Sequence, residues 1–248
     1  MGLPHIVARE EWQAAREELL AKEKAATRAR DALNAERRGL PMVEVDKEYV
    51  FDGADGKASL LDLFAGRAQL IVHHFMFAPE WDAGCRGCAA FLDQIGHLAH
   101  LRARGTTFVA ASRAPFTRVL PFKARMGWVV PWYATCGAEF NRDFDATRPD
   151  ADGRLLDRPG LSCFLRDGDR VFHTYSTFDR GLDGIGSTSS LLDLTALGRQ
   201  EEWEEPKGRA SELGAPAGGA RLRYHDEYDE HDECGTYESY ETYGRYGY

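Results

Sequence analysis

The stretch QLIVHHFMFAPEWDAGCRGCAAFLDQIGHLAHLRAR, residues 69–104, decides the fold. It opens with a nearly unbroken apolar run at 70–77, which is too short to span a bilayer and is typical of a buried central strand. A loop leads to CRGC at 85–88. From Phe91 on, apolar residues keep helical spacing until Gly105. The sequence therefore predicts a strand, a cysteine pair and a helix in direct succession.

The position of the two cysteines predicts different chemistry for each. Cys85 stands at the start of the helix, where free N–H groups and the helix dipole favour negative charge. This environment lowers a thiol pKa from about 8.5 toward or below neutrality, and the thiolate is the reactive form. Cys88 lies one turn further on and can close a disulfide with Cys85. We therefore interpret the pair as a redox motif in which Cys85 attacks and Cys88 resolves.

Two other interpretations of the pair stay open. A structural zinc site needs four ligands, usually including a second CxxC or an HxxxH, whereas Cys136, Cys163 and Cys234 are single and far apart. The pair could also be inert, because free cysteine packs as a small apolar side chain. Of the single cysteines, Cys136 could share a disulfide, and Cys163 is expected to be a core residue.

Composition sets the class of protein. The chain has 248 residues, of which 43% are hydrophobic, enough for one sizeable core. Its apolar runs stay below the roughly 18 residues of a membrane span, and its first residues lack the pattern of a signal peptide. Five cysteines argue against a secreted disulfide scaffold, and a net charge of −9 does not favour nucleic-acid binding. We expect a cytoplasmic protein that binds neither membranes nor nucleic acids.

The N-terminal part, residues 1–41, is predicted to be a helical extension. Residues 9–38 form one long, highly charged helical segment with few apolar residues, among them Trp12, Leu19 and Leu33. We expect a solvated helix that docks along one stripe or pairs with a second subunit in a homodimer.

The C-terminal part, residues 204–248, is predicted to lie outside the α/β domain at 42–203. Its composition shifts to Pro, Gly and Ala and then to Tyr, Asp and Glu. A disordered acidic tail is the preferred interpretation. The alternative is a metal site formed by His225, His231 and Cys234 among the carboxylates.

The rest of the chain alternates strands and helices. We expect an alternating strand at 43–51, a buried strand at 106–112, a helix at 116–126, an aromatic strand at 128–133, a polar loop at 147–160, a hairpin at 161–175 and a last helical piece at 191–197. Pro121 should kink its helix or restart it. This order is that of an α/β, thioredoxin-like fold with peroxiredoxin-type additions in front.

Several motifs carry a family resemblance. FDGADGKASLLDLFAG before the central strand resembles the lead-in of peroxiredoxins. More narrowly, the chain resembles the bacterial thioredoxin-like family labelled domain of unknown function 899 at REEWQAAREELLAKEKAATRARDALNAERR, HFMF, GCRGC, SRAPF, RMGW, PGLS and DRVFHTYSTFDRGLD. The resemblance covers roughly residues 5–200. It implies a dithiol–disulfide oxidoreductase that needs no cofactor and acts on a protein or small-molecule thiol or disulfide.

The chain departs from its wider relatives at the active-site prolines. A peroxidatic cysteine would need a Pro-x-x-x-Thr-x-x-Cys lead-in, which is absent after Pro79. Thioredoxins place a proline opposite the CxxC, eight residues before the glycine of the final hairpin. Counted back from Gly168, that position is Gly160, with Pro159 one residue off. We therefore expect no proline to face the sulfurs.

Four further side chains are candidates for the site. Trp81, four residues before Cys85, could form its floor or simply pack as an aromatic. Arg113, at the end of a strand, could hold a charged substrate, stabilise a thiolate or form a plain salt bridge. His73 and His74 are adjacent on the central strand and must face opposite sides of the sheet. Each is either a hydrogen-bonded core residue or a partner of Cys85.

Copper binding is the alternative function. Copper-delivering proteins with a thioredoxin fold use paired cysteines and a distant histidine, and Cu(I) prefers soft ligands. Here Cys85 and Cys88 with His173, or with His73 or His74, would be the ligands.

Overall fold

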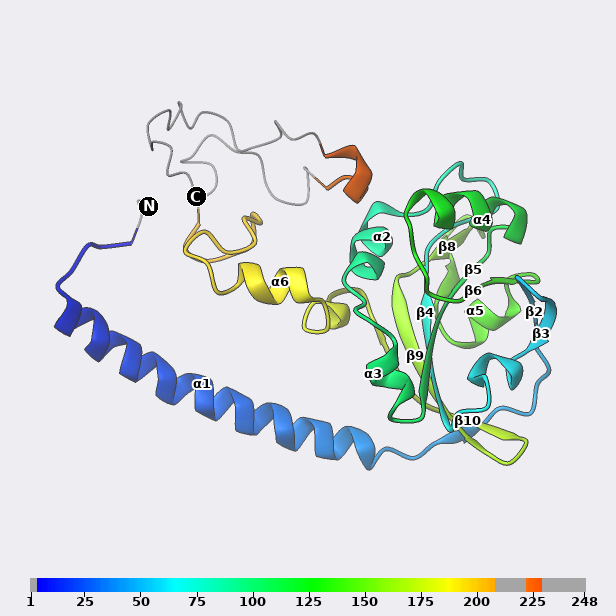
Figure 1. Cartoon of the computed structure of the whole chain (residues 1–248), viewed down its shortest axis with the longest axis horizontal. Helices are drawn as coiled ribbons and strands as arrows, with labels where there is room; N and C mark the ends of the chain where they lie inside the picture. The colour runs from blue at the N-terminus through cyan, green and yellow to red at the C-terminus, as the bar shows by residue number, and fades with distance from the viewer. Residues whose placement is uncertain (1–3, 208–221, 229–248) are drawn as a thin grey trace, which may run out of the picture.

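The computed structural model of the chain describes residues 4–207 and 222–228 (Figure 1). They form an eight-stranded sheet, ordered β1-β10-β9-β4-β5-β6-β2-β3, and a two-stranded sheet of β7 and β8. In chain order the elements are α1 (Arg9–Arg38), β1 (Val43–Glu44), β2 (Val50–Gly53), β3 (Gly56–Ser59), η1 (Asp62–Phe64), β4 (Gln69–His74), α2 (Arg86–Asp93), α3 (Ala99–Arg102), β5 (Thr106–Ser112), α4 (Phe116–Arg125), β6 (Trp132–Thr135), α5 (Glu139–Asp143), β7 (Thr147–Pro149), β8 (Leu155–Asp157), β9 (Gly160–Asp167), β10 (Arg170–Phe178), η2 (Asp179–Leu182), α6 (Ser187–Leu192) and η4 (His225–Glu227).

Strand β4 occupies the middle of the large sheet, as predicted. It pairs with β5 in parallel and with β9 antiparallel, and β10 pairs antiparallel with β9. A parallel pair needs a crossover, which α2 and α3 supply between β4 and β5. The order β5-β4-β9-β10, with a helix leaving β4 at the cysteines, is that of a thioredoxin-like fold, so the predicted fold class is confirmed.

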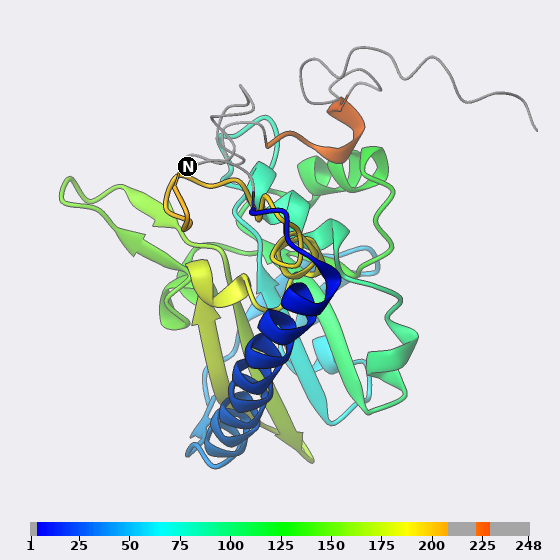
Figure 2. The ribbon, with the colours of Figure 1, turned by 90° about the vertical axis from the view of Figure 1, so that its left-hand side faces the viewer.

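The sheet is buried on both faces, which explains the three successive apolar residues of β4, Leu70, Ile71 and Val72. One face packs against α2 and α4 through a cluster that includes Phe75, Phe91 and Phe122. The other face carries a second cluster that includes Phe51 and Phe164. Figure 2 shows α2 and α4 together on one side of the sheet.

The two adjacent histidines of β4 lie on opposite faces, as the strand geometry predicts. The His73 ring lies 4.9 Å from the Phe91 ring, in the cluster beneath α2. The His74 ring lies 5.6 Å from the Phe140 ring, in the second cluster. His73 therefore belongs to the face that carries the cysteines.

Helix α1 forms over the predicted residues but buries none of its side chains. Figure 1 shows it running away from the sheet, with its C-terminal end near β10. There Arg37 lies 4.7 Å above the Tyr175 ring. No helix among residues 4–207 and 222–228 is long and apolar enough to cross a membrane.

Several predicted boundaries were wrong. The helix expected up to Gly105 ends at Asp93, and α3 follows it as a separate helix from Ala99. Helix α4 continues through Pro121 and does not restart there, whereas the kink expected at Pro121 stays a prediction. The predicted polar loop at 147–160 contains the β7–β8 pair. Helix α6 begins at Ser187, earlier than expected. The division into three domains stays a prediction, although residues 222–228 are packed against the α/β domain and are not a separate tail.

Candidate functional site

Cys85 and Cys88 lie at the junction between β4 and α2. Cys85 directly precedes the helix, with extended backbone angles of φ −61° and ψ 131°. Its N–H donates to the Met76 carbonyl at 2.9 Å, and the Met76 N–H donates to Cys88 Sγ at 3.4 Å. At Gly84, a Cβ would lie 2.4 Å from the Phe75 ring, so this close approach requires glycine. The loop is thus held tightly against the end of β4.

The two thiols have opposite pKa shifts. The pKa of Cys85 is lowered to about 6, because the Cys88 thiol and the backbone N–H groups of Cys88 and Gly87 donate to its sulfur and outweigh the effect of burial. The pKa of Cys88 is raised well above its usual value by its hydrogen bond with Cys85 and by burial, since Cys88 is only 1% exposed. The site can therefore offer a thiolate at Cys85 and keep Cys88 protonated near neutral pH.

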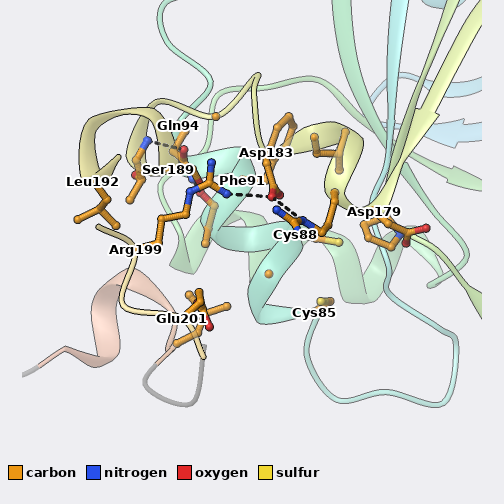
Figure 3. Close-up of a pocket in the computed structure, with 18 of the residues that line it drawn as sticks. Cys85, Cys88, Phe91, Gln94, Asp179, Asp183, Ser189, Leu192, Arg199 and Glu201 are labelled. Atoms are coloured by element: carbon orange, nitrogen blue, oxygen red, sulfur yellow. Dashed lines mark hydrogen bonds and ion pairs between the residues drawn. The ribbon is translucent and has the colours of Figure 1, made fainter. Parts of the chain in front are cut away.

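A cavity of about 780 Å³ opens beside the two sulfurs. Figure 3 shows the sulfurs on α2 and, across the cavity, Leu192, Arg199 and Glu201. Its walls come from the end of β4, from α2, from η2 and α6, and from two C-terminal segments at 199–203 and 222–228. The cavity joins elements that lie far apart in the sequence.

His73 is the buried polar residue of this cavity. It is completely buried, lines the cavity with both cysteines, and neither ring nitrogen has a hydrogen-bond partner among the described residues. Burial, and then the nearby His74, lowers the pKa of His73 to about 3. It is therefore a neutral imidazole with one donor and one acceptor unsatisfied, a costly arrangement for stability alone.

Pro159 also lines the cavity with Cys85 and Cys88. The expectation that no proline faces the sulfurs stays a prediction. Strand β9 runs from Gly160 to Asp167. Pro159 directly precedes this strand.

Trp81 and Arg113 do not line the cavity. Trp81 lies in the loop before the cysteines with its side chain 38% exposed, and its carbonyl accepts a hydrogen bond from Arg118 at 2.7 Å. Arg113 forms a buried ion pair with Asp157 at 2.7 Å. Of the three interpretations of Arg113, this contact corresponds to the plain salt bridge. Their assignment to the site stays a prediction.

Asp157 was missed in the sequence, where it is one acid in a polar segment. Its carboxylate is buried, accepts a hydrogen bond from Thr147 at 2.5 Å and has one oxygen without a partner among the described residues. Its negative charge adds to the rise in the pKa of Cys88. It therefore helps to keep Cys88 protonated.

His74 and His173 are joined on the opposite face of the sheet. Hydrogen bonds of 2.8 Å each link His74 to Ser162, Ser162 to Ser176, and Ser176 to His173. The His173 ring packs 5.1 Å from Phe144, in the second cluster. The structure does not bring His173 to the thiols, and the described residues contain no group of three His, Cys, Asp or Glu that could hold a metal ion.

The other single cysteines also lie apart from the site. Cys136 is exposed, 3.3 Å from Lys57 Nζ and 3.2 Å from the Asp52 carboxylate. Cys163 is partly buried on β9, and burial raises its pKa. Cys234 and His231, the residues of the alternative metal site in the tail, lie outside the described residues.

The segment at 222–228 is docked against α2 and α4, contrary to the interpretation of residues 204–248 as a disordered tail. The Tyr224 hydroxyl donates to the Gly84 carbonyl, next to Cys85, and its ring packs 5.5 Å from Phe122. Arg125 donates to both oxygens of Asp226, at 2.7 and 2.8 Å. Further contacts are the His225–Asp93 hydrogen bond at 2.8 Å and the Arg86–Glu227 ion pair at 3.7 Å.

The family model described as a bacterial protein of unknown function, DUF899, matches residues 1–228, so the chain belongs to this family. No curated protein matches the chain. Similar solved structures include peroxiredoxin Q from Xanthomonas campestris, with 16% identity, a TM-score of 0.43 and coverage of 56% of this chain and 87% of that chain. A putative thiol:disulfide interchange protein DsbE from Chlorobium tepidum has 16% identity, a TM-score of 0.39 and coverage of 64% and 99%. These likenesses are too distant to bear on the chemistry of the site.

Proposed function

We propose that this member of the DUF899 family is an enzyme, a cytoplasmic dithiol–disulfide oxidoreductase. The single observation that carries the proposal is the unequal pair of thiols. Cys85 lies at the start of α2 with a pKa of about 6, and Cys88 lies buried behind it with a raised pKa. A depressed pKa at the attacking thiol and a protonated second thiol within hydrogen-bonding reach are what disulfide exchange requires.

In this reaction the Cys85 thiolate attacks one sulfur of a substrate disulfide. A mixed disulfide forms, and the other substrate sulfur leaves as a thiolate that takes up a proton. Cys88 then loses its proton and attacks Cys85 Sγ, which releases the second substrate thiol and leaves a Cys85–Cys88 disulfide. Two electrons pass from the protein to the substrate, and an external dithiol reduces the protein again.

Alkylation of the reduced protein across pH tests these roles. The rate at Cys85, followed by mass spectrometry of peptides, should rise with a midpoint near pH 6, because the thiolate is the reacting species. Cys88 should react far more slowly at every pH below 8. Cys85→Ser should abolish disulfide reduction, whereas Cys88→Ser should trap the mixed disulfide. Faster alkylation of Cys88 would reverse the assignment.

Copper binding is the alternative proposal, and the geometry supports it less. His173, its preferred imidazole ligand, lies in the second cluster, although His73 shares the cavity with the thiols. Stoichiometric copper on the purified protein, lost in Cys85→Ser or His73→Ala, would favour it over the redox enzyme.

A further inference from the structure

We infer that the cavity beside Cys85 binds the substrate of the proposed reaction, and that this substrate is a small, neutral and largely apolar disulfide. The inference rests on the proposed function and specifies its substrate. Four features carry it: the apolar walls, the pairing of the wall charges, the C-terminal segments around the thiols, and the unpaired imidazole of His73.

The first feature is the apolar part of the cavity lining. The apolar side chains that line the cavity are Met76, Phe91, Leu182, Leu192, Trp203 and Leu222. Removing apolar substrate surface from water against such side chains favours binding. A ligand with aromatic or alkyl groups therefore gains from contact with these side chains.

The second feature is that the basic side chains of the wall are already engaged. Arg199 pairs with Asp193 at 2.7 Å and with Asp183 at 2.9 Å. Arg180 pairs with Asp183 at 3.3 Å and lies 4.0 Å above the Trp203 ring. No free cation of the described wall is therefore directed at an anionic ligand.

The remaining charges near the thiols do not favour an anion either. The Asp179 carboxylate pairs with Arg158 at 2.5 Å, and Glu201 lines the cavity without an ion pair to another described residue. Arg86, between the two cysteines, lies 3.7 Å from Glu227 and 5.5 Å from the Tyr224 ring. An anionic disulfide would therefore meet the carboxylate of Glu201 without a compensating cation.

The third feature is the position of the C-terminal segments. Trp203, Leu222 and Tyr228 line the cavity together with Cys85 and Cys88. The contacts of Tyr224 with Gly84 and Phe122 hold the segment that carries Leu222 and Tyr228 in place. Cys85 is only partly exposed. This arrangement suits a small molecule that enters the cavity better than a folded protein that must lay a chain segment across the sulfur.

The fourth feature is His73, which offers a polar contact deep in the cavity. Its neutral ring has one N–H donor and one acceptor without partners among the described residues. An N–H that donates to the departing substrate sulfur would stabilise that thiolate until it gains its proton. The substrate gains two electrons from the protein, and the external dithiol then reduces the Cys85–Cys88 disulfide, as in the proposed reaction.

Two chromogenic aromatic disulfides test the inference, because they differ mainly in charge. Dithiodipyridine is neutral near pH 7, and dithiobis(nitrobenzoate) is a dianion. For each probe, the rate constant with the reduced protein is divided by that with 2-mercaptoethanol, a thiol without other charged groups, which removes intrinsic reactivity. The normalised rate should be at least about tenfold higher for the neutral probe, since the site stabilises apolar groups and offers no free cation. Equal normalised rates, or a preference for the dianion, would overturn the inference.

Neighbouring leucines of α6 provide a matched pair of variants. Leu192 lines the cavity, whereas Leu191 is 63% exposed and does not. Leu192→Lys should lower the normalised rate for dithiodipyridine at least about fivefold, because it places a charge on the apolar wall, and Leu191→Lys should leave it unchanged. The alkylation profile of Cys85 should be the same in both variants. Equal effects of the two substitutions would contradict the inference.

Insulin, a protein disulfide substrate, separates this inference from the proposed function. Cys85-dependent reduction of insulin that is faster than that of dithiodipyridine would sustain the oxidoreductase and overturn the small-substrate cavity. No Cys85-dependent reduction of any of the three disulfides would overturn the proposed function itself.

Discussion

The two ends of the described chain differ in how far their side chains are buried against the domain. Helix α1 has 30 residues and buries none of them, and three of its large apolar side chains, Trp12, Leu19 and Leu33, are 46%, 50% and 54% exposed. The segment at 222–228 has no helix longer than a single 3-10 turn, yet Tyr224 is only 7% exposed. The short segment is joined to the domain far more closely than the long helix.

The difference shows that local regularity and tertiary attachment have separate causes. A long helix of charged residues forms because its backbone hydrogen bonds and i,i+4 pairs lie within the segment. Attachment depends on partners elsewhere in the chain. Tyr224 donates a hydrogen bond to Gly84 and packs against Phe122, and Asp226 forms an ion pair with Arg125. The described residues provide no comparable apolar partner for α1, since none of its side chains is buried.

The largest expected effect comes from removing an aromatic side chain at each end. Tyr224→Ala should lower the free energy of unfolding by about 2–4 kcal/mol, because it empties a buried site and leaves the Gly84 carbonyl without its donor. In protein diluted to monomer, Trp12→Ala should change it by less than about 0.5 kcal/mol. Urea midpoints at constant m-value would measure both. Equal losses would refute the contrast between the two ends.

The same contrast explains which features the sequence predicted. The order of strand, CxxC and helix was predictable because the apolar run and the start of the helical spacing are local. The end of that helix at Asp93 was not, because the helical spacing continues beyond it. The position of Cys85 directly before α2 followed from that pattern. The long helix α1 was predictable for the same reason, although its lack of attachment was not.

The features that the sequence did not show depend on distant contacts. Asp157 can be buried because it forms an ion pair with Arg113 and accepts a hydrogen bond from Thr147. Pro159 lies at the cavity because the next residue, Gly160, pairs with His74 at the end of β4. Tyr224 lies in a segment whose acidic composition is typical of a disordered tail, and its partners precede it by about a hundred residues or more. No periodic pattern marks such pairs.

A smaller effect is expected from the ion pairs of the docked segment, and it should depend on pH. Hydrogen bonds from Arg125 lower the pKa of Asp226 and of Glu227 below their usual values. Groups whose pKa is lower in the folded state stabilise the fold above their unfolded pKa, near 4, and lose this effect as the pH falls through the folded pKa. Arg125→Ala should therefore destabilise the protein at pH 7, and the difference from wild type should shrink below about pH 4.

Urea unfolding at a series of pH values would measure this dependence. Arg28→Ala, which removes an exposed arginine of α1, is the matched control and should show no such pH dependence. A constant destabilisation by Arg125→Ala down to pH 3 would mean that the arginine acts through its packing on the Tyr224 ring, 5.1 Å away, and not through the carboxylates.

The smallest effect on unfolding is expected from α1, whose apolar residues we propose to be covered by α1 of a second copy. Trp12, Leu19, Ala26 and Leu33 recur every seven residues, which places them along one stripe. Residues 9–20 carry four acids and two bases, and residues 21–38 carry three acids and six bases. An antiparallel pair of these helices therefore brings halves of opposite net charge together.

Sedimentation equilibrium over a range of concentrations would test the pairing. The full chain should associate reversibly to a dimer, and Leu19→Glu should shift it to monomer, because it places a charge within the shared stripe. Glu18→Gln, one residue away, should leave the association nearly intact, since it removes one charge at the edge of the stripe. The free energy of unfolding of the monomeric Leu19→Glu protein should lie within about 0.5 kcal/mol of that of the wild type diluted to monomer, because Leu19 has no buried contact in the single chain. A wild-type chain that stays monomeric at all concentrations would leave α1 as a solvated helix and refute the pairing.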